Sequence, residues 1–122
     1  MDSFAQELRQ RTLAYTSRAI VYCRSLPDNW IAREIGRQLL RAGMGVSGNY
    51  WSACRARSRR EFIARLAVAT DESEENVLWL TAIQRSGIRD DRETMLLLTE
   101  AQELRAILAK STRTARQNRD SS

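Results

Sequence analysis

Apolar side chains recur at alternating intervals of four and three residues through almost the whole chain, and the pattern breaks at only three places. This spacing places one apolar stripe along one side of a helix, which is how helices bury themselves in a bundle. Residues with good helix propensity fill the same stretches. The pattern therefore predicts four long helices, each with one buried side.

The four stripes can be read directly from the chain. Over residues 2–25 the stripe is Leu8, Thr12, Tyr15, Ala19, Tyr22 and Leu26. Over residues 29–56 it is Ile35, Leu39, Ala42, Val46, Asn49, Ala53 and Ala56. Over residues 58–86 it is Phe62, Leu66, Ala69, Ser73, Asn76, Leu80 and Ile83. The last stripe is Leu97, Ala101, Leu104 and Leu108, and the pattern fades after Lys110.

Each break carries a recognisable helix signal. Pro27 ends the first helix because proline restrains the preceding residue and has no amide hydrogen to donate. Ser58 and Glu61 form a capping box that starts the third helix. Gly87 is typical of a helix end, and Asp90 and Glu93 predict a second capping box.

Three glycines lie inside the second stretch, at positions 43, 45 and 48. They either interrupt the helix or allow another helix to approach closely, and we favour close approach because the apolar spacing continues in phase beyond them. Asn49 falls on the predicted buried side, so it is expected to have a buried hydrogen-bond partner.

These elements predict an all-α fold, an antiparallel up-down-up-down four-helix bundle over residues 1–110. Residues 111–122 are expected to form a basic, disordered tail. The length is that of one domain. Without a long apolar run or a hydrophobic leader, the protein is expected to be cytoplasmic and to have no membrane partner. Cys23 and Cys54 are then reduced packing residues.

Positive charge is concentrated in one region. Residues 33–65 contain eight arginines against two glutamates, a formal charge of +6 in a chain whose net charge is +5. Such a concentration is the footprint of a polyanion-binding surface. The alternative is a solvated face with weak surface ion pairs. We take the candidate nucleic-acid-binding residues to be Arg33, Arg37, Arg41, Arg55, Arg59 and Arg60.

Nothing in the chain nominates an enzyme. There is no histidine, which removes the commonest general base and neutral metal ligand, and no nucleotide-binding or hydrolase motif is present. Glu72 and Glu75 are expected to neutralise arginines rather than to hold a metal, so no cofactor and no metal are predicted. Among the tryptophans, Trp51 neighbours the basic block and is the one candidate for stacking on a base, whereas Trp79 should pack.

The stretch QLLRAGMGVSGNYWSACRARSRREFIARLAVATDESEENVLWL resembles the bacterial four helix bundle protein family, first noticed as products of intervening sequences in large-subunit ribosomal RNA genes. The resemblance rests on small residues before Asn49, on Arg57-Ser58, on Glu61-Phe62, and on Glu72 and Glu75. It departs where the family commonly has a glutamate three residues after the asparagine, because this chain has Ser52 there.

The resemblance implies a homopentamer of antiparallel four-helix bundles. Distant relatives are accessory proteins of diversity-generating retroelements, basic pentamers that bind nucleic acid and a reverse transcriptase. The same resemblance also implies a structural polar network of Asn49, Arg57, Ser58, Glu72 and Glu75.

The combined hypothesis is a non-enzymatic, oligomeric bundle that binds RNA or DNA with weak sequence specificity through phosphate contacts. It could serve as an accessory factor to a reverse transcriptase or an RNA-processing system. The rival hypothesis is an interaction scaffold whose arginines bind an acidic protein partner.

Overall fold

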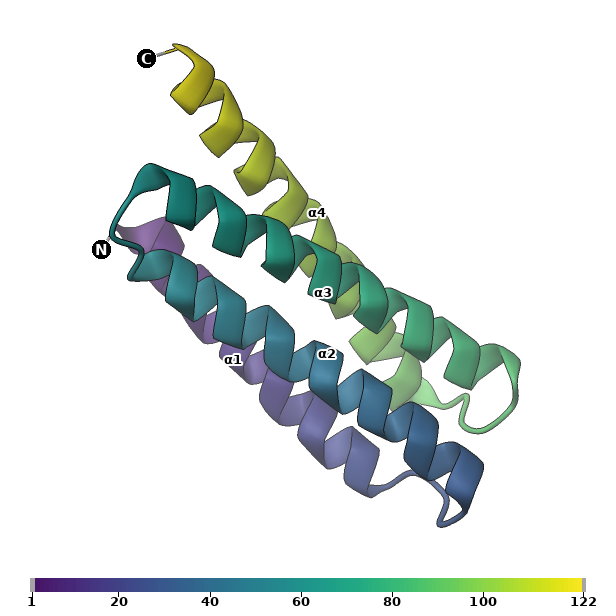
Figure 1. The fold of residues 1–122 in the computed structure, drawn as a ribbon. Coiled ribbons are helices and arrows are strands. Elements are labelled where there is room, and N and C mark those ends of the chain that lie inside the picture. The colour runs from purple at the N-terminus through teal and green to yellow at the C-terminus, as the bar shows by residue number, and fades with distance from the viewer. Residues whose placement is uncertain (1, 122) are drawn as a thin grey trace.

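A computed structural model describes residues 2–121 of the chain. It contains four α-helices, α1 (Ser3–Arg24), α2 (Trp30–Cys54), α3 (Arg59–Arg85) and α4 (Arg92–Ser121). The chain reverses direction at each of the three connections, so neighbouring helices run antiparallel (Figure 1). Helices that follow one another in sequence pack against one another in space. The predicted all-α four-helix bundle is confirmed.

Short polar side chains start every helix. The Asn29 side chain accepts the amide of Ala32 at 2.9 Å, and Asp2 does the same for Ala5 at the start of α1. Ser58 Oγ accepts the amide of Glu61 at 3.1 Å, as predicted. Each such bond satisfies an amide that the helix itself leaves open.

The predicted cap of α4 was wrong by one residue. Asp91, rather than Asp90, accepts the amide of Thr94 at 3.0 Å. Asp90 instead accepts a hydrogen bond from the side chain of Gln84 at 3.0 Å, which ties it to the end of α3.

The buried sides of α1, α3 and α4 follow the predicted stripes closely. All four predicted residues of α4 are buried, and in α3 the stripe from Leu66 to Ile83 is buried while Phe62 is only half-buried. Asn76 is completely buried and accepts a hydrogen bond from the hydroxyl of Tyr15 at 2.7 Å. A polar pair in the middle of an apolar core fixes which helix faces which.

The helix α2 continues unbroken through its three glycines, as favoured from the sequence. A side chain at Gly43 would sit 3.4 Å from the Cβ of Ala19 on α1, so this position brings two helices together. A side chain at Gly45 would come within 3 Å of the Glu72 side chain. At Gly48 nothing lies within 4 Å, so close packing explains only part of the glycine pattern.

The predicted burial of Asn49 was wrong. Tyr50 takes the buried position, while Asn49 is half-exposed and donates to the carbonyl of Gly45 at 2.8 Å. The buried residues after Val46 are Tyr50 and Ala53, so a step of four residues precedes a step of three, and Ala53 is buried as predicted.

The expectation that the last helix fades after Lys110 was also wrong. Helix α4 runs on to Ser121, and Thr112 and Ala115 are buried on its inner side. Thr112 Oγ1 lies 3.2 Å from Thr70 Oγ1 on α3. Small and polar residues extend the contact there, and the C-terminal part of α4 passes the turn between α2 and α3 (Figure 1).

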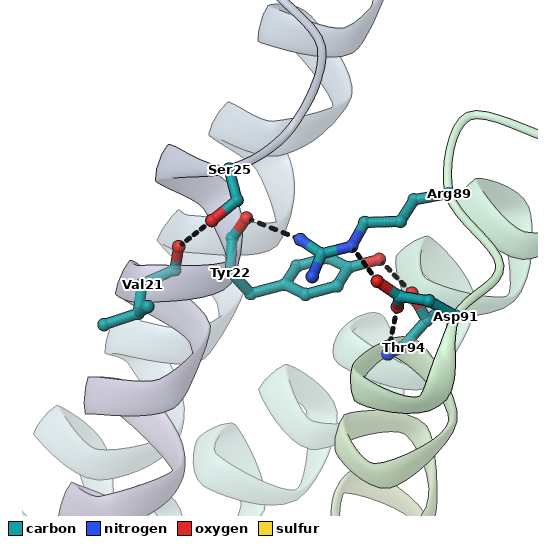
Figure 2. A network of polar contacts seen from close by, with 6 residues as sticks. All are labelled: Val21, Tyr22, Ser25, Arg89, Asp91 and Thr94. Atoms are coloured by element: carbon teal, nitrogen blue, oxygen red, sulfur yellow. Dashed lines mark hydrogen bonds and ion pairs between the residues drawn. The ribbon is translucent and has the colours of Figure 1, made fainter.

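Two of the connections, residues 25–29 and 86–91, lie together at what we call the two-loop end. There the guanidinium of Arg89 lies 4.2 Å from the centre of the Tyr22 ring and donates to Asp91 at 2.8 Å (Figure 2). The hydroxyls of Tyr22 and Thr94 are 2.6 Å apart. This network joins the end of α1 to the start of α4 through the loop that precedes it.

Within residues 2–121 no helix is long and apolar enough to cross a membrane.

Candidate nucleic-acid interface

The opposite end of the molecule holds the turn between α2 and α3, residues 55–58, with the start of α1 and the later part of α4 beside it (Figure 1). We call this the junction end. Side chains alternate along the turn. Arg55 and Arg57 line one cleft, and Ala56 and Ser58 line another. The turn therefore separates a charged side from a mainly apolar side.

The charged side is a cleft of about 570 Å³, which we call the basic cleft. Its lining residues are Ser52, Arg55, Arg57, Glu61 and Arg65. Three guanidinium groups thus face one carboxylate. That carboxylate already accepts the backbone amide of Arg57 at 3.1 Å, as part of the helix cap. The basic cleft keeps an excess of positive charge.

Arg59 and Arg60 extend this charge onto the first turn of α3, where both are exposed. In the part of the chain that the structure describes, the side chains of Arg55, Arg57, Arg59 and Arg60 form no ion pair. The open amides at the start of a helix also favour anions. The predicted residues Arg55, Arg59 and Arg60 therefore lie together around one helix start.

The structure does not bring Arg33, Arg37 and Arg41 to the same place. Arg37 lies 18 residues before Arg55, the residue that follows the end of α2, which corresponds to about 27 Å along the helix axis. Arg33 is bonded to Asp28 at 2.6 Å, and Arg37 lies 3.8 Å from Glu34. The six predicted arginines therefore form two groups. In the first, Arg33 and Arg37 have carboxylate neighbours, whereas no arginine of the junction-end group forms an ion pair with the described side chains.

The five residues of the expected polar network also lie apart. Asn49 accepts a hydrogen bond from Arg65 at 3.3 Å, and Ser58 caps α3. Glu72 lies over Gly45, near the middle of the bundle. Burial raises the pKa of the Glu72 carboxyl, Glu75 raises it further, and Arg41 opposes both.

Arg57 contributes only its backbone amide to the cap, and its guanidinium faces the basic cleft. Among the described residues its side chain therefore forms no ion pair with Glu72 or Glu75, the acidic members of the network that the resemblance implied.

Trp51, the candidate for stacking on a base, is in contact with Arg9 of the same chain. The guanidinium of Arg9 lies 4.0 Å from the centre of its ring, and its indole nitrogen donates to the carbonyl of Arg9 at 3.1 Å. One face of the ring is therefore covered by the protein's own cation. Trp79 packs against the core as predicted, and Trp30 is 72% exposed at the start of α2.

Among the described residues no cluster of three or more acidic or cysteine side chains could hold a metal ion. Cys23 and Cys54 are free and half-buried. Burial raises the pKa of both thiols, to about 11 for Cys23.

Sequence reasoning missed the position of two cleft residues, Arg57 and Arg65. The resemblance places Arg57 in the structural network, and the charge count includes Arg65 in the basic region without giving it a role. One signal could have found Arg65, because it lies four residues after Glu61 and so on the same face of α3. No local pattern predicts that Ser52 of α2 and Arg55 of the turn face Arg65.

Comparison with known proteins supports the fold. A family model described as 23S rRNA-intervening sequence protein matches residues 6–110. A crystal structure from Bacteroides thetaiotaomicron, described as a protein with unknown function from the S23 ribosomal protein family, matches with a TM-score of 0.80 and 22% sequence identity. The match covers 86% of this chain and 97% of that chain. No curated protein matches.

Proposed function

The chain belongs to the 23S rRNA-intervening sequence protein family, and from its junction-end arginines we propose that it is a non-enzymatic nucleic-acid-binding protein. In this proposal, phosphates enter the basic cleft and the adjoining first turn of α3. The observation that carries the proposal is the group of four exposed arginines, Arg55, Arg57, Arg59 and Arg60, which form no ion pair with the described side chains of residues 2–118.

The physical reason is electrostatic. Like charges gathered on one surface repel one another, and a bound polyanion removes that repulsion. Each phosphate that replaces a counterion also releases it to solution, so affinity falls as salt rises. Guanidinium groups can contact phosphate through two parallel hydrogen bonds. Phosphates carry no sequence information, so specificity for sequence is weak.

Assembly is the second part of the proposal. The resemblance implies a homopentamer, which would repeat the basic cleft around a symmetry axis. The chain supports a contact surface on α3 and α4, where Leu78 is 54% and Met95 58% exposed and Val77 and Leu98 are half-buried beside the core. Ile63 of α3 does not contribute to this surface, because it is buried in the core of its own chain. Light scattering at micromolar concentration should give a mass several times that of one chain, and a monomer would contradict this part.

The same resemblance suggests the biological partner that we propose. An accessory role beside a reverse transcriptase or an RNA-processing system fits a protein that holds phosphates without reading sequence. An acidic protein is the alternative ligand for the same arginines.

The proposal is tested by fluorescence anisotropy on a labelled single strand across a salt series. Replacing Arg55, Arg59 and Arg60 with glutamine should lower the slope of log affinity against log salt by roughly 0.7 to 0.9 for each phosphate that is no longer bound. The matched control replaces three exposed arginines with glutamine at the helix ends next to the two-loop end, Arg24, Arg85 and Arg92. This control should keep the wild-type slope of log affinity against log salt. A wild type that does not bind at low salt would overturn the proposal in favour of the acidic protein partner.

A third variant separates the two arginine groups. Replacing Arg37 and Arg41 with glutamine should lower the slope less than the junction-end variant does, because Arg37 already lies beside Glu34 and Arg41 beside Glu72.

A further inference from the structure

The mainly apolar side of the α2–α3 turn is a second cleft, of about 690 Å³. All four helices contribute to it, through Phe4 of α1, Tyr50 of α2, Phe62 of α3 and Ser111 of α4. We call it the apolar cleft. It lies outside the basic cleft, and the phosphate contacts proposed above do not use its interior.

Its lining suits a flat aromatic ring. The volume is within the range of about 300 to 1,000 Å³ that ligand pockets show. Phe4 is 58% exposed and Phe62 half-buried, so both offer ring surface to the solvent. The hydroxyl of Ser111, the thiol of Cys54 and the carboxylate of Asp2 add a few polar groups. Nucleobases bind to surfaces of this kind by stacking and by edge hydrogen bonds.

The arginines around the apolar cleft indicate which class of ligand would bind there. Arg59 lines it, and Ser58 and Ala56 in its wall alternate along the turn with Arg55 and Arg57 of the basic cleft. A ring in one cleft and a phosphate in the other would be separated by a single turn of backbone. An uncharged apolar ligand would leave these arginines without partners, and a duplex offers no unpaired base.

We propose that the apolar cleft receives an unpaired nucleobase of a single-stranded nucleic acid, whose neighbouring phosphates lie on the arginines of the turn. The inference rests on the proposed function for those phosphate contacts. It adds that the protein distinguishes single strands from duplexes, and that the bases contribute to affinity without being read for sequence.

The first test compares two labelled oligomers of the same length, an oligodeoxyadenylate and an oligomer with abasic sugars in place of the nucleosides. Both carry the same phosphates. The base-bearing strand should bind on the order of 5- to 150-fold more tightly, the factor that one stacked base provides. A duplex of matched length should bind like the abasic strand. Equal affinity for both strands would overturn the inference while leaving the proposed function intact.

The two cysteines report where the base goes. Cys54 lines the apolar cleft, whereas Cys23 lies in a different groove between α1 and α2, beside Leu26 and Pro27. At mildly alkaline pH, saturating oligodeoxyadenylate should slow alkylation of Cys54 and leave the rate for Cys23 unchanged. The abasic strand at saturation should protect neither thiol. Protection of Cys54 by both strands would mean that the backbone alone covers the cleft, and would overturn the inference.

A filling variant provides an independent measurement. Ser111→Trp places a large side chain in the apolar cleft from a half-exposed position on α4. It should reduce the affinity for the oligodeoxyadenylate to that for the abasic strand. The matched control is Ser17→Trp, at an exposed position on α1 toward the two-loop end, and it should keep the wild-type difference. Circular dichroism should show that both variants keep the helix content of the wild type. A Ser111→Trp protein that still prefers bases would contradict the inference.

If neither strand binds to wild type at low salt, both proposals fail together. If both strands bind with the salt dependence expected for phosphates but with equal affinity, only the binding of a base in the apolar cleft is excluded.

Discussion

At the two-loop end Arg89 is bonded to Asp91 and the Tyr22 carbonyl and lies over the Tyr22 ring. At the junction end, by contrast, four arginines are exposed and form no ion pair with the described side chains of residues 2–118, namely Arg55, Arg57, Arg59 and Arg60. The same residue type thus serves two purposes. A guanidinium that is enclosed by its own chain closes a loop against a helix. Guanidiniums that are left open keep their hydrogen-bonding capacity for an external anion.

The difference arises from the local sequence at each end. At the two-loop end each connection carries acidic residues, Asp28 in one and Asp90 and Asp91 in the other. The turn at the junction end, residues 55–58, contains none, and the next carboxylate in the sequence, Glu61, is engaged in the helix cap. Arg89 is structural because Asp91 lies within bonding distance, whereas Arg55 and Arg57 have no uncommitted carboxylate in their turn.

The largest effect on stability should come from Arg89→Ala. The variant loses hydrogen bonds to Asp91 and to the Tyr22 carbonyl together with the ring contact, so the free energy of unfolding in urea should fall by about 1–2 kcal/mol. Nucleic-acid affinity should not change. The matched variant Arg59→Ala should show the reverse, with stability within about 0.5 kcal/mol of wild type and weaker binding. Equal losses of stability in both variants would remove the distinction between the two ends.

The next effect concerns Ser52, which lines the basic cleft at the position where the family resemblance predicts a glutamate. Ser52→Glu adds a second carboxylate beside three arginines and should cancel one phosphate contact. Affinity for a single strand should then fall roughly five- to eightfold at about 0.1 M salt. Ser52→Gln has a similar shape without the charge and serves as the control. Equal affinity in the glutamate and glutamine variants would show that phosphate does not enter this cleft.

The smallest expected effect is a pH dependence of the folding stability, caused by Asp91 at the two-loop end. Bonds from the Thr94 amide and from Arg89 hold the pKa of Asp91 down at about 2. A lowered pKa means that the ionised carboxylate stabilises the fold above its ordinary pKa, near about 4. This stabilisation is lost as the pH falls from there to about 2.

Urea midpoints of wild type and Asp91→Asn across that interval measure this loss. Because other carboxylates, such as Glu100, titrate in both proteins, only the difference between the two midpoints is informative. That difference should shrink as the pH falls. A constant difference would show that the Asp91 charge does not support the loop.

The sequence predicted the fold well because each helix carries its own signals. Ser58 and Pro27 mark boundaries through local chemistry, and Leu97 to Leu108 mark a buried side through spacing alone. The prediction was wrong where the signal is weak. Between Val46 and Tyr50 the chain has only Ser47, Gly48 and Asn49, which give no apolar contrast, so Asn49 was placed inside instead of Tyr50. Beyond Lys110 the buried residues are Thr112 and Ala115, whose small or polar side chains give little apolar contrast.

The candidate site was less accessible to sequence reasoning, because it depends on how two helices face each other. The count of arginines located the basic region correctly. It could not show that Arg33 and Arg37 have acidic neighbours while Arg55 and Arg57 form no ion pair among the described residues, nor that Arg65 of α3 faces Ser52 of α2. The apolar cleft was not predicted at all, since its walls come from all four helices.

The order of the helices in space has a consequence for how the chain reaches its native state. Because α1 packs on α2, α2 on α3 and α3 on α4, most contacts join segments that are close in the chain, and little chain entropy is lost before each one forms. Proteins with such local topology fold within microseconds to milliseconds. The hairpin of α1 and α2 can therefore assemble during synthesis while α4 is still being translated. The bond between Arg11 of α1 and Glu100 of α4, at 2.7 Å, joins the first helix to the last. It can form only after Glu100 has been synthesised, so closure of the α1–α4 seam comes later than assembly of the α1–α2 hairpin.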